Sequence, residues 1–222
     1  MRPFDLEPQI ERLIASGIGR IQRISDDVYR KIWPKIVVMP EKLDGRFDRA
    51  LCVDAFPLYP MHTVVDRGDR RETLPVRLLP MPGRDKPASV AFGQEDEQAL
   101  APLEHRQHAQ LMRYVVFWQA GERWKGSSPN ALRSRFDADE CGLRLNEGLH
   151  LALQEEELLK KRHLPLSDRM YDRGETYFAH WGGATPSFTL SYGMFAELDG
   201  VPSRAREVIP VSTEDQDFYL KA

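Results

Sequence analysis

Met112-Arg113-Tyr114-Val115-Val116-Phe117-Trp118 is the stretch that decides the fold, because it has the strongest β-strand character in the chain. Its residues are mostly β-branched or aromatic, and such side chains fit the pleated, half-buried surface of a sheet. We expect it to be a strand that buries about half of its aromatic side chains, since successive side chains point to opposite faces. Short strands are predicted before it, and helices followed by strands are predicted after it.

Two helices are predicted at the N-terminus. The first has a repeating apolar face and is followed by Gly17, a residue suited to a left-handed cap. The second begins after Ser25, a good N-cap residue, has acidic residues in its first turn, and is stopped by Pro34. The apolar face of the first helix consists of Leu6, Ile10, Leu13 and Ile14.

Short strands are predicted from Lys35 to about Phe92, because β-branched runs alternate there with turns that contain proline or glycine. Proline lacks the N–H group that a ladder needs, so we expect many of these strands to end at sheet edges. The predicted strands are residues 36–39, 51–56, 63–65, 76–79 and 89–92.

Helices precede strands in the C-terminal half. Ser128 is predicted to cap a helix that has Pro129 at its first position and runs to about Phe136. Asn146 is predicted to cap a longer helix, whose basic end complements the helix dipole. Strands at 176–181 and 188–192 would form a hairpin around a glycine-rich loop. The longer helix would turn Leu149, Leu153 and Leu158 inward and expose the charged runs 155–157 and 160–162.

The order of these elements indicates an α+β fold. Strands and helices come in blocks without a steady βαβ alternation, which argues against a doubly wound sheet. We predict antiparallel sheets with an N-terminal helical pair and a later capped helix. The 222 residues suit one α+β domain over 1–222, and if the chain has two lobes, they meet near residues 94–111.

Composition and charge argue against several classes of protein. Apolar residues make up 41% of the chain, enough for a core, while 29% charged residues argue against a membrane protein. The net charge of −3 gives no field that favours nucleic acid or an anionic membrane. No apolar run approaches the roughly 18 residues of a spanning helix, and acids stand where a signal peptide would need an apolar run.

Cysteine usage indicates a reducing compartment. Cys52 and Cys141 lie far apart, in segments without the spacing of a disulfide scaffold. We therefore expect both thiols to be reduced and unpaired, and we predict a soluble, cytoplasmic protein.

Short motifs in the C-terminal half carry a resemblance to other proteins. They are Phe-Trp-Gln-Ala-Gly at 117–121, Asn-Glu-Gly-Leu at 146–149, Leu-Pro-Leu-Ser at 164–167, and the late strand pair around Trp181 and Gly182. In these motifs the stretch from Trp118 to Tyr192, about a third of the chain, resembles a family of uncharacterised bacterial proteins of about this length. The resemblance implies a fold relationship and no catalytic residues.

Metal sites receive little support. Glu147 and His150 share a helical face, as ligands of di-iron carboxylate bundles do, but such sites need a second copy of this tetrad and two further glutamates. We therefore expect His150 to be a partly buried histidine near the start of a helix. His105 and His108 would need a distant third ligand for zinc, and a solvated polar connector explains them better.

Other chemical motifs are also incomplete. Residues 137–142 begin like a calcium loop, but Cys141 and Gly148 occupy the fifth and twelfth ligand positions. The sequence has no G-x-S-x-G elbow, no Walker loop and no glycine-rich turn after a strand. Acidic neighbours would disfavour the Cys141 thiolate, the opposite of an activated cysteine. We predict no cofactor and no metal, although a triad assembled from distant residues stays open.

Residues 113–135 form the one basic and aromatic segment. Cations interleaved with aromatic rings are typical of proteins that bind single-stranded nucleic acid. The rest of the chain is acidic, and a strand at 112–118 would leave few rings for bases. The charged residues are Arg113, Arg123, Lys125, Arg133 and Arg135 against Glu122.

A ligand pocket is predicted near His180. Trp181 is the better core residue, so alternation along the strand would leave His180 at the sheet surface beside the glycine loop. The predicted ligand-binding residues are His180, Trp181, Trp118 and Trp124.

Three functions remain open. The first is a binding or accessory module without enzymatic activity, for an unknown small molecule or protein partner, in an unknown oligomeric state and with no membrane partner. The second is a hydrolase with an unrecognised site that uses His180 or His150. The third is binding of single-stranded nucleic acid through residues 113–135.

Overall fold

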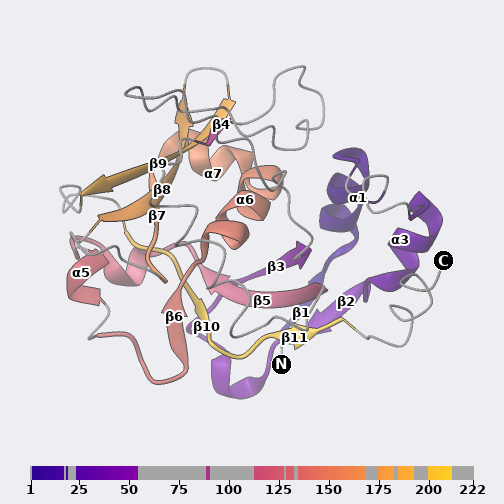
Figure 1. The fold of residues 1–222 in the computed structure, drawn as a ribbon. Helices are drawn as coiled ribbons and strands as arrows, with labels where there is room; N and C mark the ends of the chain where they lie inside the picture. Colours follow the sequence, from indigo (N-terminus) through magenta and orange to yellow (C-terminus); the bar gives the residue numbers. More distant parts are fainter. Residues whose placement is uncertain are drawn as a thin grey trace.

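The strand β5 (Arg113–Gln119) is the centre of a five-stranded sheet (Figure 1). This computed structural model describes residues 2–17, 19, 24–54, 89–90, 113–127, 129–132, 135–168, 175–182, 185–192 and 200–211. β3 (Arg49–Asp54) pairs with β5 from Arg49 opposite Trp118 to Asp54 opposite Arg113. The strands β10 (Ser203–Ala205) and β11 (Ile209–Pro210) share the other edge of β5, and β6 (Glu140–Gly142) pairs with β10.

β5 is more deeply buried than its sequence predicts. All seven of its residues are buried, so Tyr114, Phe117 and Trp118 all belong to the core and none is left at the surface. The expectation that about half of the aromatic side chains would be buried was therefore wrong. Both faces of the strand are covered: Phe117 packs on Phe4 of the N-terminal ribbon, with ring centroids 5.8 Å apart, and Tyr114 reaches Glu147 of a helix.

The two predicted N-terminal helices are confirmed as α1 (Glu7–Ala15) and α3 (Asp26–Ile32). Gly17 has the predicted left-handed backbone, with φ of 82°. The Ser25 side chain accepts a hydrogen bond from the Val28 N–H at 3.4 Å, which confirms the predicted cap. α1 and α3 contact each other, and α1 also contacts β3.

The strands on either side of these two helices in the sequence pair with each other as a two-stranded antiparallel ribbon. It consists of β1 (Pro3–Asp5) and β2 (Ile36–Val38), which lie beside each other in Figure 1. β2 was predicted. β1 was not, because one proline and one aspartate in three residues give no strand signal.

The helices after β5 differ from the prediction at their ends. α5 (Pro129–Leu132) begins at the predicted proline, and among the described residues that follow it, the N–H groups of Arg135 and Phe136 both bond to the Leu132 carbonyl. α6 (Leu145–Gln154) is capped by Arg144, not by Asn146. A break at Glu155 separates it from α7 (Glu156–Lys161), so the single long helix was wrong.

The charged runs on these helices are only partly solvated. Glu157 is exposed and pairs with Lys160 at 2.7 Å, in line with the prediction. Glu155 is half-buried, because its carboxylate pairs with Arg49 of β3 at 3.1 Å. Leu153 is buried as predicted, Leu158 only partly so.

A second, four-stranded sheet has the order β4 (Ser89–Val90), β9 (Thr185–Tyr192), β8 (Glu175–Gly182) and β7 (Leu164–Leu166). β8 and β9 form the predicted antiparallel hairpin, and β4 pairs with β9 in parallel. α6 and α7 contact β8, and α6 also contacts β3 and α1. The predicted strands at 63–65 and 76–79, the lobe boundary at 94–111, His105 and His108 lie outside the described residues.

The predicted α+β class is confirmed: the chain combines an N-terminal helix pair with antiparallel sheets. Within the described ranges, no helix has both the length and the apolar character to cross a bilayer.

Candidate functional site

One face of helix α6 carries three polar side chains into the interior. Glu147, His150 and Gln154 are buried, and their spacing of three and four residues places them in one row along the helix. A helix face of this kind normally carries apolar residues, since burying a polar group costs free energy unless it is hydrogen-bonded. The partners of these three side chains therefore decide what they do.

Two glutamines bind the free edge of strand β3. β5 occupies one edge of β3, so alternate backbone groups of β3 point away from the sheet. Gln9 of α1 donates to the Ala50 carbonyl at 2.7 Å and accepts from the Cys52 N–H at 2.9 Å, as a neighbouring peptide group would. Gln154 donates to the Cys52 carbonyl at 3.0 Å.

His150 completes this row of contacts. Its Nε2 accepts a hydrogen bond from the Asp54 N–H at 2.9 Å, and both residues are fully buried. An imidazole nitrogen accepts only when it carries no proton, so this bond requires the tautomer with the proton on Nδ1. Three side chains thus take the place of a missing strand along β3, and we call Gln9, Gln154 and His150 the edge clasp.

The edge clasp bears on the predicted roles of His150. Its Nε2 lone pair is engaged by a backbone N–H, so a metal ion or a substrate proton at Nε2 would have to displace that bond. His150 is also fully buried, where the sequence predicted partial burial. This geometry favours a structural role for His150 over catalysis.

Asp54 also anchors a buried charge cluster through its side chain. One oxygen, Oδ2, accepts from the Tyr29 hydroxyl at 2.8 Å and from Nε of Arg113 at 3.1 Å. The Arg113 guanidinium lies 5.4 Å from the centroid of the Tyr29 ring. The pKa of Tyr29 is raised well above its ordinary value, mainly by burial and secondly by the negative charge of Asp54. The hydroxyl therefore stays protonated and remains a donor.

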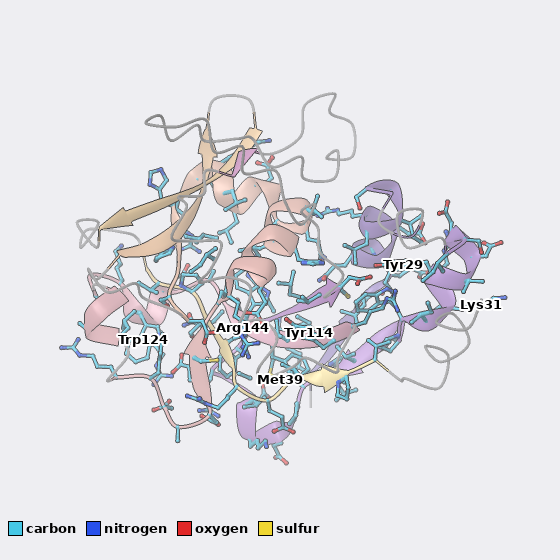
Figure 2. The ribbon with its side chains drawn as sticks, in the orientation of Figure 1. Tyr29, Lys31, Met39, Tyr114, Trp124 and Arg144 are labelled. Atoms are coloured by element: carbon cyan, nitrogen blue, oxygen red, sulfur yellow. The ribbon has the colours of Figure 1, made fainter. Side chains whose placement is uncertain are left out.

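A second buried pair lies at the start of α6. Oε2 of Glu147 accepts from Nε of Arg204 at 2.8 Å and from the Arg144 N–H at 2.8 Å, so one carboxylate both caps the helix and neutralises a buried cation. Tyr114 donates to its other oxygen at 3.4 Å. Burial is the largest single influence and acts to lower the pKa of Arg204, but the negative charges around it, Glu147 first among them, together outweigh burial and hold the pKa above the ordinary value. Figure 2 shows Tyr114 and Arg144 near the middle of the molecule.

A third buried carboxylate, Glu140 of β6, contacts the half-exposed Trp124. This tryptophan lies in the short 3-10 helix η2 (Glu122–Trp124). The Trp124 indole N–H donates to Glu140 Oε1 at 3.1 Å, and Ser203 donates to the same oxygen. The Arg123 guanidinium lies 4.7 Å from the Trp124 ring centroid, and Phe136 packs edge-on at 5.8 Å. The Trp124 ring thus contacts a cation and a second ring, while its indole N–H is bound by the Glu140 carboxylate.

Both cysteines are buried and unpaired, as predicted. Cys141 lies in strand β6, directly after the acidic residues 137–140. Burial is the main cause that raises the pKa of Cys141 to about 11, and burial also raises the pKa of Cys52. Neither thiol therefore has the character of a nucleophile at neutral pH.

The four predicted ligand residues lie in two different sheets and a turn. Trp118 is fully buried in β5, and the Arg49 guanidinium lies 5.3 Å from its ring centroid. Trp124 lies far from Tyr29 in Figure 2, at the opposite end of the molecule. His180 and Trp181 are adjacent in β8, opposite Ser187 and Pro186 of β9. Their side chains lie outside the described part of the structure, so the pocket near His180 stays a prediction.

The basic segment 113–135 is less accessible than its composition indicates. Arg113 is buried against Asp54, and Trp118 is in the core. Arg123 pairs with Asp137 at 3.0 Å and with Glu140 at 3.4 Å. Two cations of this segment are thus neutralised by carboxylates of the same chain.

The acidic residues 137–139 are also engaged. Asp139 pairs with Arg46, and Asp137 lies 3.5 Å from the same guanidinium. The Arg46 hydrogen bond holds the pKa of Asp139 below its ordinary value. Among the described residues, no group of three or more histidine, cysteine, aspartate or glutamate side chains could hold a metal ion.

The free edge of β2 contrasts with the occupied edge of β3. Leu6 donates to Lys35 and Met39 donates to Arg2 across the ribbon, at 2.8 and 3.0 Å, so odd-numbered residues of β2 face β1. The backbone groups of Ile36 and Val38 therefore point away from β1, where no described strand pairs with them.

The side chains on this edge are exposed as well. Ile36 is 62% exposed and Val38 is 44% exposed, and they are the exposed large apolar residues of the described part of the chain. Val37 between them is buried. The sequence predicted this strand but not its position at the surface; the flanking prolines, which favour edges, were the available signal.

The comparisons add no relative to this description: no family model, no curated protein and no solved structure matches the chain, and the resemblance of its C-terminal motifs to uncharacterised bacterial proteins stays a prediction.

Proposed function

We propose that this protein is a binding module without enzymatic activity, which recognises an extended segment of a protein partner at the free edge of β2. The observation that carries this proposal is the exposure of Ile36 and Val38 on a strand whose outer backbone groups have no described partner strand. An exposed edge of this kind offers hydrogen bonds to any extended chain, and alternate side chains then give specificity.

The two edges of the ribbon support the choice of β2. On β1 the outward positions are Pro3, which has no N–H, and Asp5, whose charge disfavours close pairing. On β2 the outward positions are the β-branched Ile36 and Val38. Natural sheets protect the edges that should stay unpaired. Within the paired residues of this ribbon, only β1 carries a proline and a charge at its outward positions, whereas the prolines of the β2 edge, Pro34 and Pro40, stand outside the strand.

The buried polar groups support a binding role over hydrolysis. Asp54 and Glu147 each receive two donors at one oxygen, and the His150 Nε2 is engaged in the edge clasp. A general base must present a lone pair to a substrate. Here the Nε2 lone pair of His150 and one oxygen of each carboxylate already accept hydrogen bonds from within the fold, and all three side chains are buried.

The same comparison favours a protein partner over nucleic acid. Stacking and phosphate contacts need exposed rings and free cations. Trp118 and Arg113 are in the core, whereas the exposed large apolar side chains among the described residues lie on the ribbon. We also propose a reducing compartment, the cytoplasm, on the ground that both buried thiols are free.

A peptide-display experiment tests the proposal. The protein, kept dilute, would be used to select from a library of nine-residue peptides rich in valine, isoleucine and threonine. We expect the selected peptides to shift the amide resonances of residues 35–39 and to lose binding to Val38→Pro, which removes one outward N–H. Val38→Thr keeps the N–H and the β-branched shape, so it is the matched control. Peptides that bind Val38→Pro as well as wild type, or a library without binders, would overturn the proposal.

A further inference from the structure

We infer that the extended segment bound at β2 is the β2 strand of a second copy of this chain, so that the protein forms a two-fold symmetric dimer by antiparallel strand pairing. This inference rests on the proposed function, because it names the partner of the same edge. The evidence for the dimer is the placement of prolines, backbone donors and exposed side chains along residues 34–40.

The segment Pro34-Lys35-Ile36-Val37-Val38-Met39-Pro40 has its prolines at equal distances from Val37. Pro34 and Pro40 fall in the same alternation as Ile36 and Val38, so all four residues direct their backbone groups outward. Proline cannot donate, which leaves the N–H groups of Ile36 and Val38 as the donors of this edge. The usable edge is short and is centred on Val37.

A two-fold axis through Val37 satisfies every one of these donors. Ile36 of one copy then stands opposite Val38 of the other, and each such pair exchanges two hydrogen bonds in an antiparallel ladder. The prolines of the two copies face each other at both ends, so pairing stops there. An isologous contact of this kind closes on itself and does not propagate into a filament.

The side chains are compatible with the same arrangement. Ile36 and Val38 share one face of the ribbon with their partners in β1, Asp5 and Pro3. Pairing about Val37 would bring the four exposed β-branched side chains of two copies together in the middle of a four-stranded sheet. Cross-strand pairs of β-branched residues are favourable, and like charges do not meet, because Lys35 stands opposite Met39.

The contact is small, so we expect weak self-association. Two short strands bury less surface than the roughly 1,000 Å² that a stable interface needs, which places this dimer among transient complexes. Sedimentation velocity over about 10 µM to 1 mM protein should therefore cover the transition from monomer to dimer.

The first measurement compares the wild type with two variants of one position. We expect Val38→Pro to weaken dimerisation by about tenfold or more, because it removes one hydrogen bond from each copy, while Val38→Thr still dimerises. The proline introduced at position 38 occupies an outward position of an edge strand, so the variant should still fold, and circular dichroism would verify that it does. A wild type that stays monomeric to 1 mM, or a Val38→Pro variant that dimerises equally well, overturns the inference.

The second measurement tests the register. Ile36→Cys and Val38→Cys copies mixed together should form disulfide-linked dimers, since these positions stand opposite each other about 5.5 Å apart between Cα atoms. Each variant alone should cross-link poorly, because its own cysteines lie on a diagonal of about 7–8 Å. The native cysteines are buried and do not compete. Equal cross-linking in the separate variants and in the mixture overturns this pairing.

The two proposals fail separately. If the wild type is monomeric while selected peptides bind at β2 and lose binding to Val38→Pro, self-pairing is wrong and recognition of a different protein segment stands. If the dimer forms and is insensitive to Val38→Pro, the interface lies elsewhere, and the peptide selection alone then decides the role of β2.

Discussion

The buried pair of Glu147 and Arg204 should be among the most expensive interactions to break in this fold. The Glu147 side chain is 0% exposed and the Arg204 side chain is 1% exposed, with 2.8 Å between Oε2 and Nε. Glu147→Gln keeps the size of the side chain and its bond to the Arg144 N–H, but it leaves a buried cation without its counter-charge. We expect a loss of about 3–5 kcal/mol in the free energy of unfolding.

A double-mutant cycle separates this charge pairing from simple loss of packing. Arg204→Met alone should cost a similar amount, since it leaves the Glu147 carboxylate buried and uncompensated. The double variant Glu147→Gln/Arg204→Met has no orphaned charge, so its cost should be smaller than the sum of the single losses by about 2 kcal/mol or more. Urea unfolding followed by tryptophan fluorescence gives the four free energies.

Glu157→Gln is the matched control for this cycle. Glu157 also pairs with a cation, Lys160, but its side chain is 74% exposed and solvent screens the pair. Its loss should stay within about 0.5 kcal/mol. Single losses at Glu147 and Arg204 as small as this one, or losses that simply add, would refute the argument that the buried ion pair holds α6 on the sheet.

Three further predictions follow from the geometry. Gln9→Ala should cost about 2–4 kcal/mol and speed amide exchange at Cys52, because it orphans a buried donor and a buried acceptor; an unchanged exchange rate at Cys52 would contradict the edge clasp. Gly121→Ala should destabilise the protein far more than Gly126→Ala in thermal unfolding. Both have positive φ, but a Cβ at Gly121 would lie 2.4 Å from the Val201 carbonyl carbon, whereas Gly126 has open space; equal losses would show that the backbone there can move. The raised pKa of Cys141 stabilises the fold below the ordinary thiol value of 9.0 and ceases to do so as the pH rises towards about 11. Wild type should therefore lose about 2–3 kcal/mol more than Cys141→Ala over that interval, and parallel pH profiles would rule this out.

Local signals in the sequence were sufficient for several elements. The helix cap at Ser25, the left-handed turn at Gly17 and the hairpin of β8 and β9 each depend on residues close together in the chain. Capping residues, glycine and β-branched runs act over a few residues, so the sequence alone specifies such features. The free state of both cysteines followed in the same way from their number and spacing.

Elements that lack a local signal were missed. β1, β6, β7, β10 and β11 are two or three residues long, and several contain proline or charged residues. They are strands because a neighbouring strand offers them hydrogen bonds, as β10 receives from both β5 and β6. Glu147 likewise moved the start of α6 from Asn146 to Arg144, since its carboxylate caps the Arg144 N–H while it pairs with Arg204 from another part of the chain.

For the candidate site, the sequence determined which polar residues exist, and the tertiary structure decided which of them are available. Glu147, His150 and Gln154 could be recognised as one helical row, but their partners on β3 and β10 lie roughly 50 to 100 positions away. Whether a lone pair faces a substrate or a backbone N–H depends on such distant contacts. In the same way, the sequence predicted the strand at residues 36–38, while only the pairing with β1 decided that Ile36 and Val38 lie on an open edge. Strand pairing is non-local, so the flanking prolines could indicate an edge strand but could not reveal which of its two edges stays free.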